Sequence, residues 1–308
     1  MGNSGRTSGA FVRRCQTRRL HALWVLLATA VGAIWALAQP AVAAAPGSVF
    51  YNPWGASTSE ATRREATRSI PLDKLQPDDR AKVESVLSNP SIFRRLPTKV
   101  VDCDPDLYLF LVRHPDVVIN IWEIMQVSQL ELRQIRDNQF QLTEPQGTVG
   151  QFSFVYRSHD THVLYGEGTY IGPLMGRPVK GRGVLVLKCG YLRETNGRYY
   201  ITSRVDCFLA IEPGGVELFT KTMSPLMGKT ADNNFVQTVS FVSSLSRTAE
   251  TNSRGVQRLA TRLGHVQPEV RARFAEVAAD VAQKSVPAAD GERVSRAETS
   301  SPSANVER

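Results

Sequence analysis

The spacing of apolar residues along the chain changes twice, from helical to alternating and back to helical. Gln76-Pro77-Asp78-Asp79 begins a short predicted helix that ends near Leu87. A short strand is predicted over 99–101. Two further helices are predicted on either side of His114-Pro115, because the residue before a proline disfavours the helical conformation.

After Gln126, apolar and polar residues alternate as they do in half-buried β-strands. Short turns separate the alternating runs. Asn196-Gly197 is the strongest hairpin signal among them, because both central residues of such a turn need positive φ. The runs predict an antiparallel meander of strands over 129–136, 139–144, 149–157, 162–171, 183–194, 198–212 and 216–223.

Helical spacing returns after residue 230. Phe235, Val239 and Val242 lie on one face of a long predicted helix over 231–248, which follows the sheet directly. A second helix is predicted over 267–284, where apolar residues recur at 4-3-4 spacing.

The first 43 residues have the composition of an export signal. They contain five arginines and no acidic residue, and an apolar run over 23–38 is followed by Ala41-Val42-Ala43. This order is that of a signal peptide cleaved after Ala43, and the apolar run is shorter than the roughly 20 residues that cross a bilayer. We therefore expect export to the periplasm or beyond and no stable membrane anchor after cleavage. The general secretory route is favoured, and Arg18-Arg19 keeps the twin-arginine route open.

The charge of the chain changes little in this picture. The 308 residues carry a net charge of +8, but without residues 1–43 the balance is 32 basic against 29 acidic residues, or +3. Such a small excess does not indicate nucleic-acid binding, and the aromatic residues have apolar rather than basic neighbours. We expect no nucleic-acid partner. A protein partner is not identified.

Five segments follow from these patterns. They are a signal peptide (1–43), a flexible entry segment with one short helix (44–91), an α+β domain (92–250), a C-terminal helical extension (251–286) and a disordered tail (287–308).

The order of elements in 92–250 is one strand, two short helices, six antiparallel strands and a long helix. This order resembles the helix-grip fold of the START-like (SRPBCC) superfamily, which includes lipid-transfer, polyketide-cyclase and pollen-allergen-like domains. The resemblance implies an α+β fold in which a curved antiparallel sheet of about six to seven strands packs on the long C-terminal helix. It also implies an apolar cavity between them. The alternative fold is an antiparallel sheet packed on helices without a cavity.

The hairpin turns predict which strand residues face this helix. A two-residue turn at Asn196-Gly197 would place Thr195 opposite Arg198 and would point Cys189 and Cys207 to opposite faces. The inward face would then hold Val184, Val186, Lys188, Ile201, Ser203 and Val205. A turn at His159-Asp160 would place on the inward face Phe152, Phe154, Tyr156, Val163, Tyr165 and Glu167.

These registers place two charged side chains, Glu167 and Lys188, inside the domain. A lone buried charge is costly unless it is paired or hydrated, so both would be polar anchors of a cavity. Alternatively, both reach water at the ends of the sheet. The predicted ligand-binding residues are Tyr165, Glu167, Lys188, Phe235, Val239 and Val242.

No motif indicates a metal or a cofactor. Three cysteines remain after the signal, Cys103, Cys189 and Cys207, so at least one is unpaired, and the partner of Cys103 stays open. No Cys-x-x-Cys pair is present. Met227-Gly228-Lys229-Thr230 resembles the end of a phosphate-binding loop, but Met223 stands where the first glycine is required. We expect no metal, no cofactor and no identifiable catalytic residue.

Three functional hypotheses follow. The first is an exported protein that sequesters an apolar small molecule or lipid between sheet and long helix. The second is an enzyme of cyclase or dehydratase type on the same fold, with Glu167 and Tyr165 as acid and base. The third is a non-catalytic cell-envelope protein without a cavity that binds a partner through helix 267–284.

Overall fold

The computed structural model describes residues 54–145, 147–171, 178–213 and 224–285, without the side chains of 224–227. In chain order the elements are α2 (Glu60–Arg68), the 3-10 helix η1 (Leu72–Lys74), α3 (Pro77–Leu87), β1 (Ile92–Arg95), β2 (Lys99–Asp102), α4 (Pro105–Arg113), α5 (Pro115–Ile124), β3 (Glu131–Arg136), β4 (Gln139–Glu144), β5 (Thr148–Arg157), β6 (Thr161–Tyr170), β7 (Val179–Arg193), β8 (Tyr199–Ile211), α7 (Ser224–Thr261) and α8 (Pro268–Ser285).

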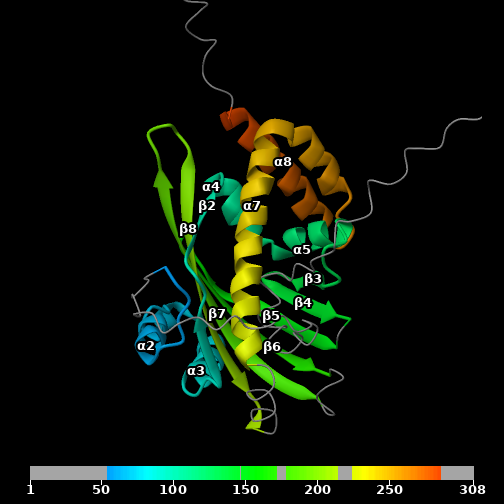
Figure 1. Cartoon of the computed structure of the whole chain (residues 1–308). Helices are drawn as coiled ribbons and strands as arrows, with labels where there is room; N and C mark the ends of the chain where they lie inside the picture. Colours follow the sequence, from blue (N-terminus) through cyan, green and yellow to red (C-terminus); the bar gives the residue numbers. More distant parts are fainter. Residues whose placement is uncertain (1–53, 146, 172–177, 214–223, 286–308) are drawn as a thin grey trace, which may run out of the picture.

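The strands form one eight-stranded antiparallel sheet in the order β1-β8-β7-β6-β5-β4-β3, and β2 also pairs with β8. The long helix α7 crosses one face of the sheet together with α4, α5 and α8, while α2 and α3 lie against the opposite face (Figure 1). We call these the inner and the outer face. The predicted α+β fold, an antiparallel sheet packed on a long C-terminal helix, is confirmed.

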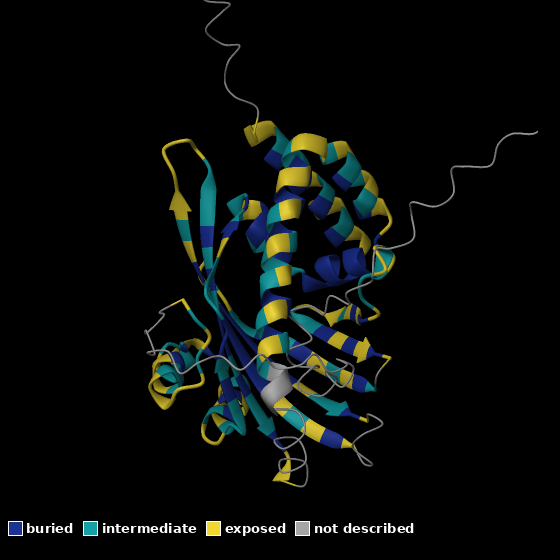
Figure 2. Ribbon diagram, viewed as in Figure 1, coloured by how far each residue is buried: buried dark blue, intermediate teal, exposed yellow. Residues whose placement is uncertain are grey.

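Each face of the sheet has its own hydrophobic core. The inner core joins the sheet to α4, α5, α7 and α8, and includes Trp122, Phe152 and Phe235. The outer core joins it to α2 and α3. Because both faces are covered, the central strands are buried on both sides, as the dark segments of Figure 2 show. In β7, the five consecutive residues from Val184 to Lys188 comprise four that are buried and one that is half-buried.

The short helices begin and end where the sequence predicts. The Asp104 carboxylate accepts hydrogen bonds from the backbone N–H groups of Asp106 and Leu107 and so caps α4. Pro115 ends that helix and occupies the first turn of α5.

Helix α7 is longer than predicted. It begins at Ser224 rather than near Ala231 and continues to Thr261, with a break at Asn252, where φ is −146° and ψ is 54°. The Asn252 side chain accepts a hydrogen bond from the N–H of Gly255 at 3.0 Å, so it caps the second helical part. The predicted strand 216–223 lies outside the described residues, as do the predicted signal peptide and tail.

The predicted register between β7 and β8 is wrong by one residue. The loop has three residues rather than two, because Glu194 donates its N–H to the Arg198 carbonyl and Gly197 takes a φ of +84°. The pairing Cys189–Ser203 follows, and every side chain of β7 changes face relative to β8. Cys189 and Cys207 therefore lie on the same face, and all three described cysteines are unpaired thiols.

The predicted face of the β5–β6 hairpin is also wrong in part. Near the turn Tyr156 pairs with Val163 as predicted, but a bulge follows and Phe154 pairs with Leu164. The additional residue in β5 shifts the pairing of β5 with β6 by one position from Phe154 on, so the β5 side chains there exchange faces relative to β6. Phe152 and Phe154 thus face α7, whereas Val163, Tyr165 and Tyr156 belong to the outer core, with Glu167 on the same outer face.

Two elements near the start of the described chain, α2 and β1, are not predicted from the sequence. Helix α2 is capped by Ser59, whose hydroxyl accepts the N–H of Thr62, and its residue Ala66 is fully buried. Strand β1 stands at one end of the strand order and pairs with β8. Arg95, at the end of β1, is 8% exposed and donates two hydrogen bonds to Asp206, at 2.6 and 3.0 Å, and one to Glu65.

Removal of the Asp206 carboxylate should destabilise the fold strongly. Asp206→Ala would leave the guanidinium of Arg95 buried without its main counter-ion, which costs about 3–5 kcal/mol. Glu65→Ala is the matched control, since Glu65 is half-exposed and such a pair contributes about 1 kcal/mol or less. Urea unfolding measures both; equal losses in the two variants would contradict the assignment of Asp206 as the main partner.

Candidate functional site

A small apolar cavity lies between the inner face of the sheet and the middle of α7. Its volume is about 70 Å³. Residues from five strands and three helices surround it, which are Val101, Tyr108, Leu111, Val112, Val118, Phe154, Leu164, Leu185, Leu187, Ser203, Phe235, Thr238, Val239 and Val242. The wall is therefore almost wholly hydrocarbon, with three hydroxyl groups.

Two of these hydroxyls form a buried pair. The Tyr108 hydroxyl lies 2.6 Å from Ser203 Oγ and 3.3 Å from Cys189 Sγ. Burial raises the pKa of Tyr108 well above its usual value and that of the Cys189 thiol to about 11. Both groups therefore keep their protons at neutral pH. They can donate or accept a hydrogen bond, but the thiol lacks the thiolate form that a nucleophile requires.

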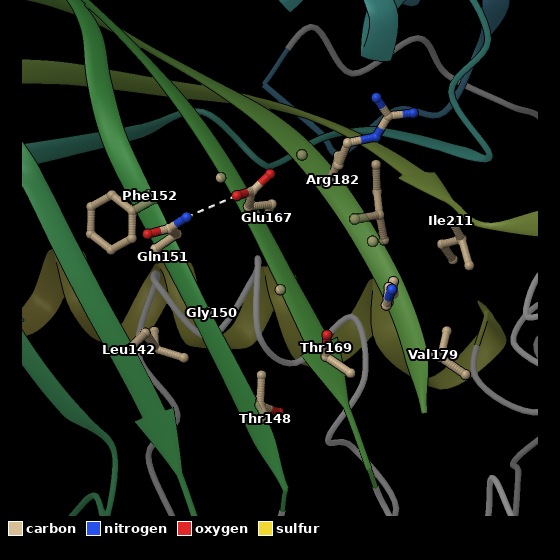
Figure 3. Close-up of a pocket in the computed structure, with 16 residues that line it drawn as sticks. Leu142, Thr148, Gly150, Gln151, Phe152, Glu167, Thr169, Val179, Arg182 and Ile211 are labelled. Carbon is tan, nitrogen blue, oxygen red and sulfur yellow. Dashed lines mark hydrogen bonds between the residues drawn. The ribbon is translucent and has the colours of Figure 1, made fainter. Parts of the chain in front are cut away.

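Five glycines form a stripe on the inner face next to this cavity. Gly150 pairs with Gly168, which pairs with Gly181, and in the adjacent row Gly166 pairs with Gly183. A second cavity of about 40 Å³ lies along this stripe and is drawn in Figure 3. At the glycines the strands present backbone, and apolar side chains such as Leu142, Phe152 and Ile211 surround it.

The glycines of this stripe differ in what they permit. A Cβ atom on Gly150 would lie 2.9 Å from the Glu167 carbonyl, and one on Gly168 equally close to that of Val149, so the close approach of β5 and β6 requires both glycines. A Cβ atom on Gly181 would lie 3.6 Å from its nearest neighbour, which is an ordinary contact. Gly181 therefore leaves room that a side chain could fill.

The predicted ligand-binding residues divide into two groups. Phe235, Val239 and Val242 line the cavity, and their role as ligand contacts stays a prediction. Tyr165, Glu167 and Lys188 lie on the outer face, so their predicted position inside the domain is wrong.

The three outer residues have other surroundings. Tyr165 is part of the outer core. Glu167 is exposed and accepts a hydrogen bond from Gln151 on the neighbouring strand at 2.8 Å (Figure 3). Lys188 is half-buried. The two charged groups thus do not anchor the cavity.

The polar groups at the cavity, and the histidine behind its wall, are not predicted from the sequence. Tyr108 and Ser203 are 95 residues apart in the chain. His162, in β6, is fully buried next to Phe154 with 6.3 Å between the ring centres, and neither of its ring nitrogens has a partner among the described residues. Burial and the charges of Arg113 and Arg157 lower the pKa of His162 to about 4.

The described residues give no further indication of a cofactor. Among them, no three His, Cys, Asp or Glu side chains gather as metal ligands would. None of the described helices is both long and apolar enough to cross a bilayer.

Comparison with known proteins gives only distant similarities. No family model matches the chain, and no curated protein matches it. Among solved structures, a conserved protein from Geobacillus kaustophilus is 10% identical over 46% of this chain and 89% of its own, with a TM-score of 0.33.

Two further solved structures are similarly distant. Ara h 8.0201 is 13% identical over 47% of this chain and 99% of its own, with a TM-score of 0.27. A truncated norcoclaurine synthase from Thalictrum flavum is 14% identical over 47% and 94%, with a TM-score of 0.28. The assignment of the fold therefore rests on the topology of this chain.

The buried His162 should make stability depend on pH. Between pH 6.5 and pH 4 the unfolded chain binds a proton at this residue and the folded chain does not, so stability falls as the pH falls, by up to about 3 kcal/mol. His162→Phe keeps a ring beside Phe154 and should lessen the slope of this part of the profile, while His114, whose pKa burial also lowers to about 4, keeps its own contribution. Urea unfolding from pH 7 to pH 4 measures it; parallel profiles in variant and wild type would contradict the prediction.

Proposed function

We propose that this chain is an exported protein that binds a small apolar molecule between its sheet and α7. One observation carries the proposal, the apolar cavity continued by a stripe of glycines on the sheet that faces α7. Glycine within a strand weakens the sheet by roughly 0.5–1 kcal/mol relative to alanine. A row of bare backbone beside an apolar cavity suits the close approach of a ligand.

The cavity sizes limit the ligand. Pockets for drug-sized ligands measure roughly 300–1,000 Å³, whereas the two cavities measure about 70 and 40 Å³. Since a water-sized probe needs at least about 10–15 Å³ on this scale, the larger cavity holds several non-hydrogen atoms. The proposed ligand is therefore narrow, such as a short alkyl chain, and it lies along the stripe from one cavity to the other.

Export is part of the proposal and depends on residues 1–43, which lie outside the described structure. The arginine-rich start, the apolar run and the small residues before Ala43 support it. In this location the protein would take up its ligand outside the cytoplasm.

The two alternative hypotheses gain no support. The enzyme hypothesis used Glu167 and Tyr165 as acid and base. The side chains of both lie on the outer face, and it is the backbone of Glu167 that borders the second cavity. The interaction hypothesis used helix 267–284. The apolar side chains of that helix, such as Phe274 and Val277, are buried in the inner core and are not free for a partner.

A larger side chain on α7 should block the cavity. Val239→Phe would occupy the space that the ligand needs, and we expect at least tenfold weaker binding of 1-octanol in calorimetric titration, about 1.4 kcal/mol. Ser240→Phe is the matched control, because Ser240 is the next residue on α7 and is exposed. If the two variants bind 1-octanol equally well, the cavity is not the binding site.

The glycine stripe should set the length of chain that is bound. Gly181→Val would narrow the second cavity, so binding should weaken for 1-decanol more than for 1-hexanol. Gly190→Val is the control, since Gly190 is exposed on the same strand, on the outer face, and a Cβ atom there would lie 3.9 Å from its nearest neighbour. Titration of both alcohols measures the effect; an equal loss for both lengths would contradict it.

A further inference from the structure

Four basic side chains from the α4–α5 junction and the β5–β6 hairpin lie close enough to act electrostatically on one another. They are Arg113 and His114 at the junction, and Arg157 and His162 on the hairpin. Burial lowers the pKa of both histidines, and the charges of both arginines lower it further. We call these residues the basic cluster.

Phe154 connects the basic cluster to the cavity. It lines the cavity, its ring centre lies 5.6 Å from the Arg157 guanidinium, and its ring lies beside that of His162. Arg113 follows Val112, another lining residue. Arg157 is exposed, whereas His162 is fully buried beside Phe154, so the basic cluster extends from the surface to a residue of the cavity wall.

Several polar atoms of the basic cluster have no partner. Both ring nitrogens of His162, Nδ1 of His114 and Nε of Arg113 are buried without a hydrogen bond within the described part of the chain. Buried polar atoms nearly always have a partner, because burial without one costs free energy. A neutral imidazole has one N–H donor and one acceptor nitrogen, so the Nε–H of Arg113 and the N–H of His162 are the buried donors that lack an acceptor.

The neighbouring acidic groups do not fill this role. Asp137 acts electrostatically on His114 and Arg157, and Asp160 acts on His162, but neither forms an ion pair with the cluster among the described residues. The Asp160 carboxylate instead accepts a hydrogen bond from Ser158 at 2.7 Å. His159, next to Asp160, adds a further basic group near His162. The site thus has an excess of donors and positive charge.

We propose that the ligand is an alkyl carboxylate, whose head group binds to Arg113, His114, Arg157 and His162 while its chain lies in the cavity. This inference rests on the proposed function, since it names the ligand class of the same site. A carboxylate has up to four acceptor positions and favours guanidinium groups. The alkyl chain meets the hydrocarbon wall formed by Phe154, Leu164 and Leu187.

Binding should be accompanied by proton uptake. The pKa of each histidine, about 4 in the free protein, rises when an anion lies beside the ring. At pH 5.5 the histidines of the free protein are mostly neutral, so a bound carboxylate draws protons from the buffer. A neutral alcohol in the same cavity draws none.

The test compares octanoate with 1-octanol, which have the same chain length and differ in head group. We expect octanoate to bind wild-type protein at least tenfold more tightly, since hydrogen bonds between charged groups are stronger than those of a neutral hydroxyl. In the double variant Arg113→Gln/Arg157→Gln the preference should disappear. Arg193→Gln is the control. Arg193 lies 5.5 Å from the ring centre of Tyr199 on the β7–β8 hairpin, much as Arg157 lies over the ring of Phe154.

The outcomes separate this inference from the proposed function. Equal binding of both compounds to wild type overturns the inference and leaves an apolar site. If neither compound binds, the proposed function fails and the inference fails with it. Titration of octanoate into wild type at pH 5.5, in two buffers of different ionisation enthalpy, needs no variant. Absence of proton uptake on binding there overturns the role of the histidines.

Discussion

The register between β7 and β8 determines which side chains of the sheet contact the long helix α7. Side chains of a strand alternate between faces, so a shift by one residue exchanges the whole inner set for the outer one. The three-residue loop that ends at Gly197 places Leu185, Leu187 and Cys189 toward α7. In the other register Val184, Val186 and Lys188 would lie beneath the helix, so the inner face would carry a charged side chain.

Much of the fold could be predicted, because periodicity is a local property. The positions of α3, α4, α5 and α8 and of β3 to β8 follow from the spacing of apolar residues and from prolines and turn residues. Strand β1 could not be predicted in this way. It has four residues, two of them arginines, and Arg95 is stabilised by Asp206, which lies 111 residues later in the chain.

The same difference between local and long-range structure limits prediction of the site to its α7 half. The helical spacing of Phe235, Val239 and Val242 identifies the inward face of α7 without any knowledge of its neighbours. For the strands, the inward face depends on the length of the loop and on the bulge between Phe154 and Tyr156. Neither can be recognised from the alternation of apolar and polar residues. The alternation is itself weak in β7, since α2 and α3 cover the outer face and both sets of side chains are apolar.

Coverage of both faces also restricts how a ligand could enter. The central strands are held by backbone hydrogen bonds to two neighbours and by a hydrophobic core on each side. Any movement of these strands would disturb both cores and the buried pair of Arg95 and Asp206. Helix α7 has only one face in the inner core, and its Ser240 side is exposed. Widening of the cavity would therefore come from displacement of α7 against a fixed sheet, and under the proposed function the glycine stripe would let a narrow ligand enter with a smaller displacement.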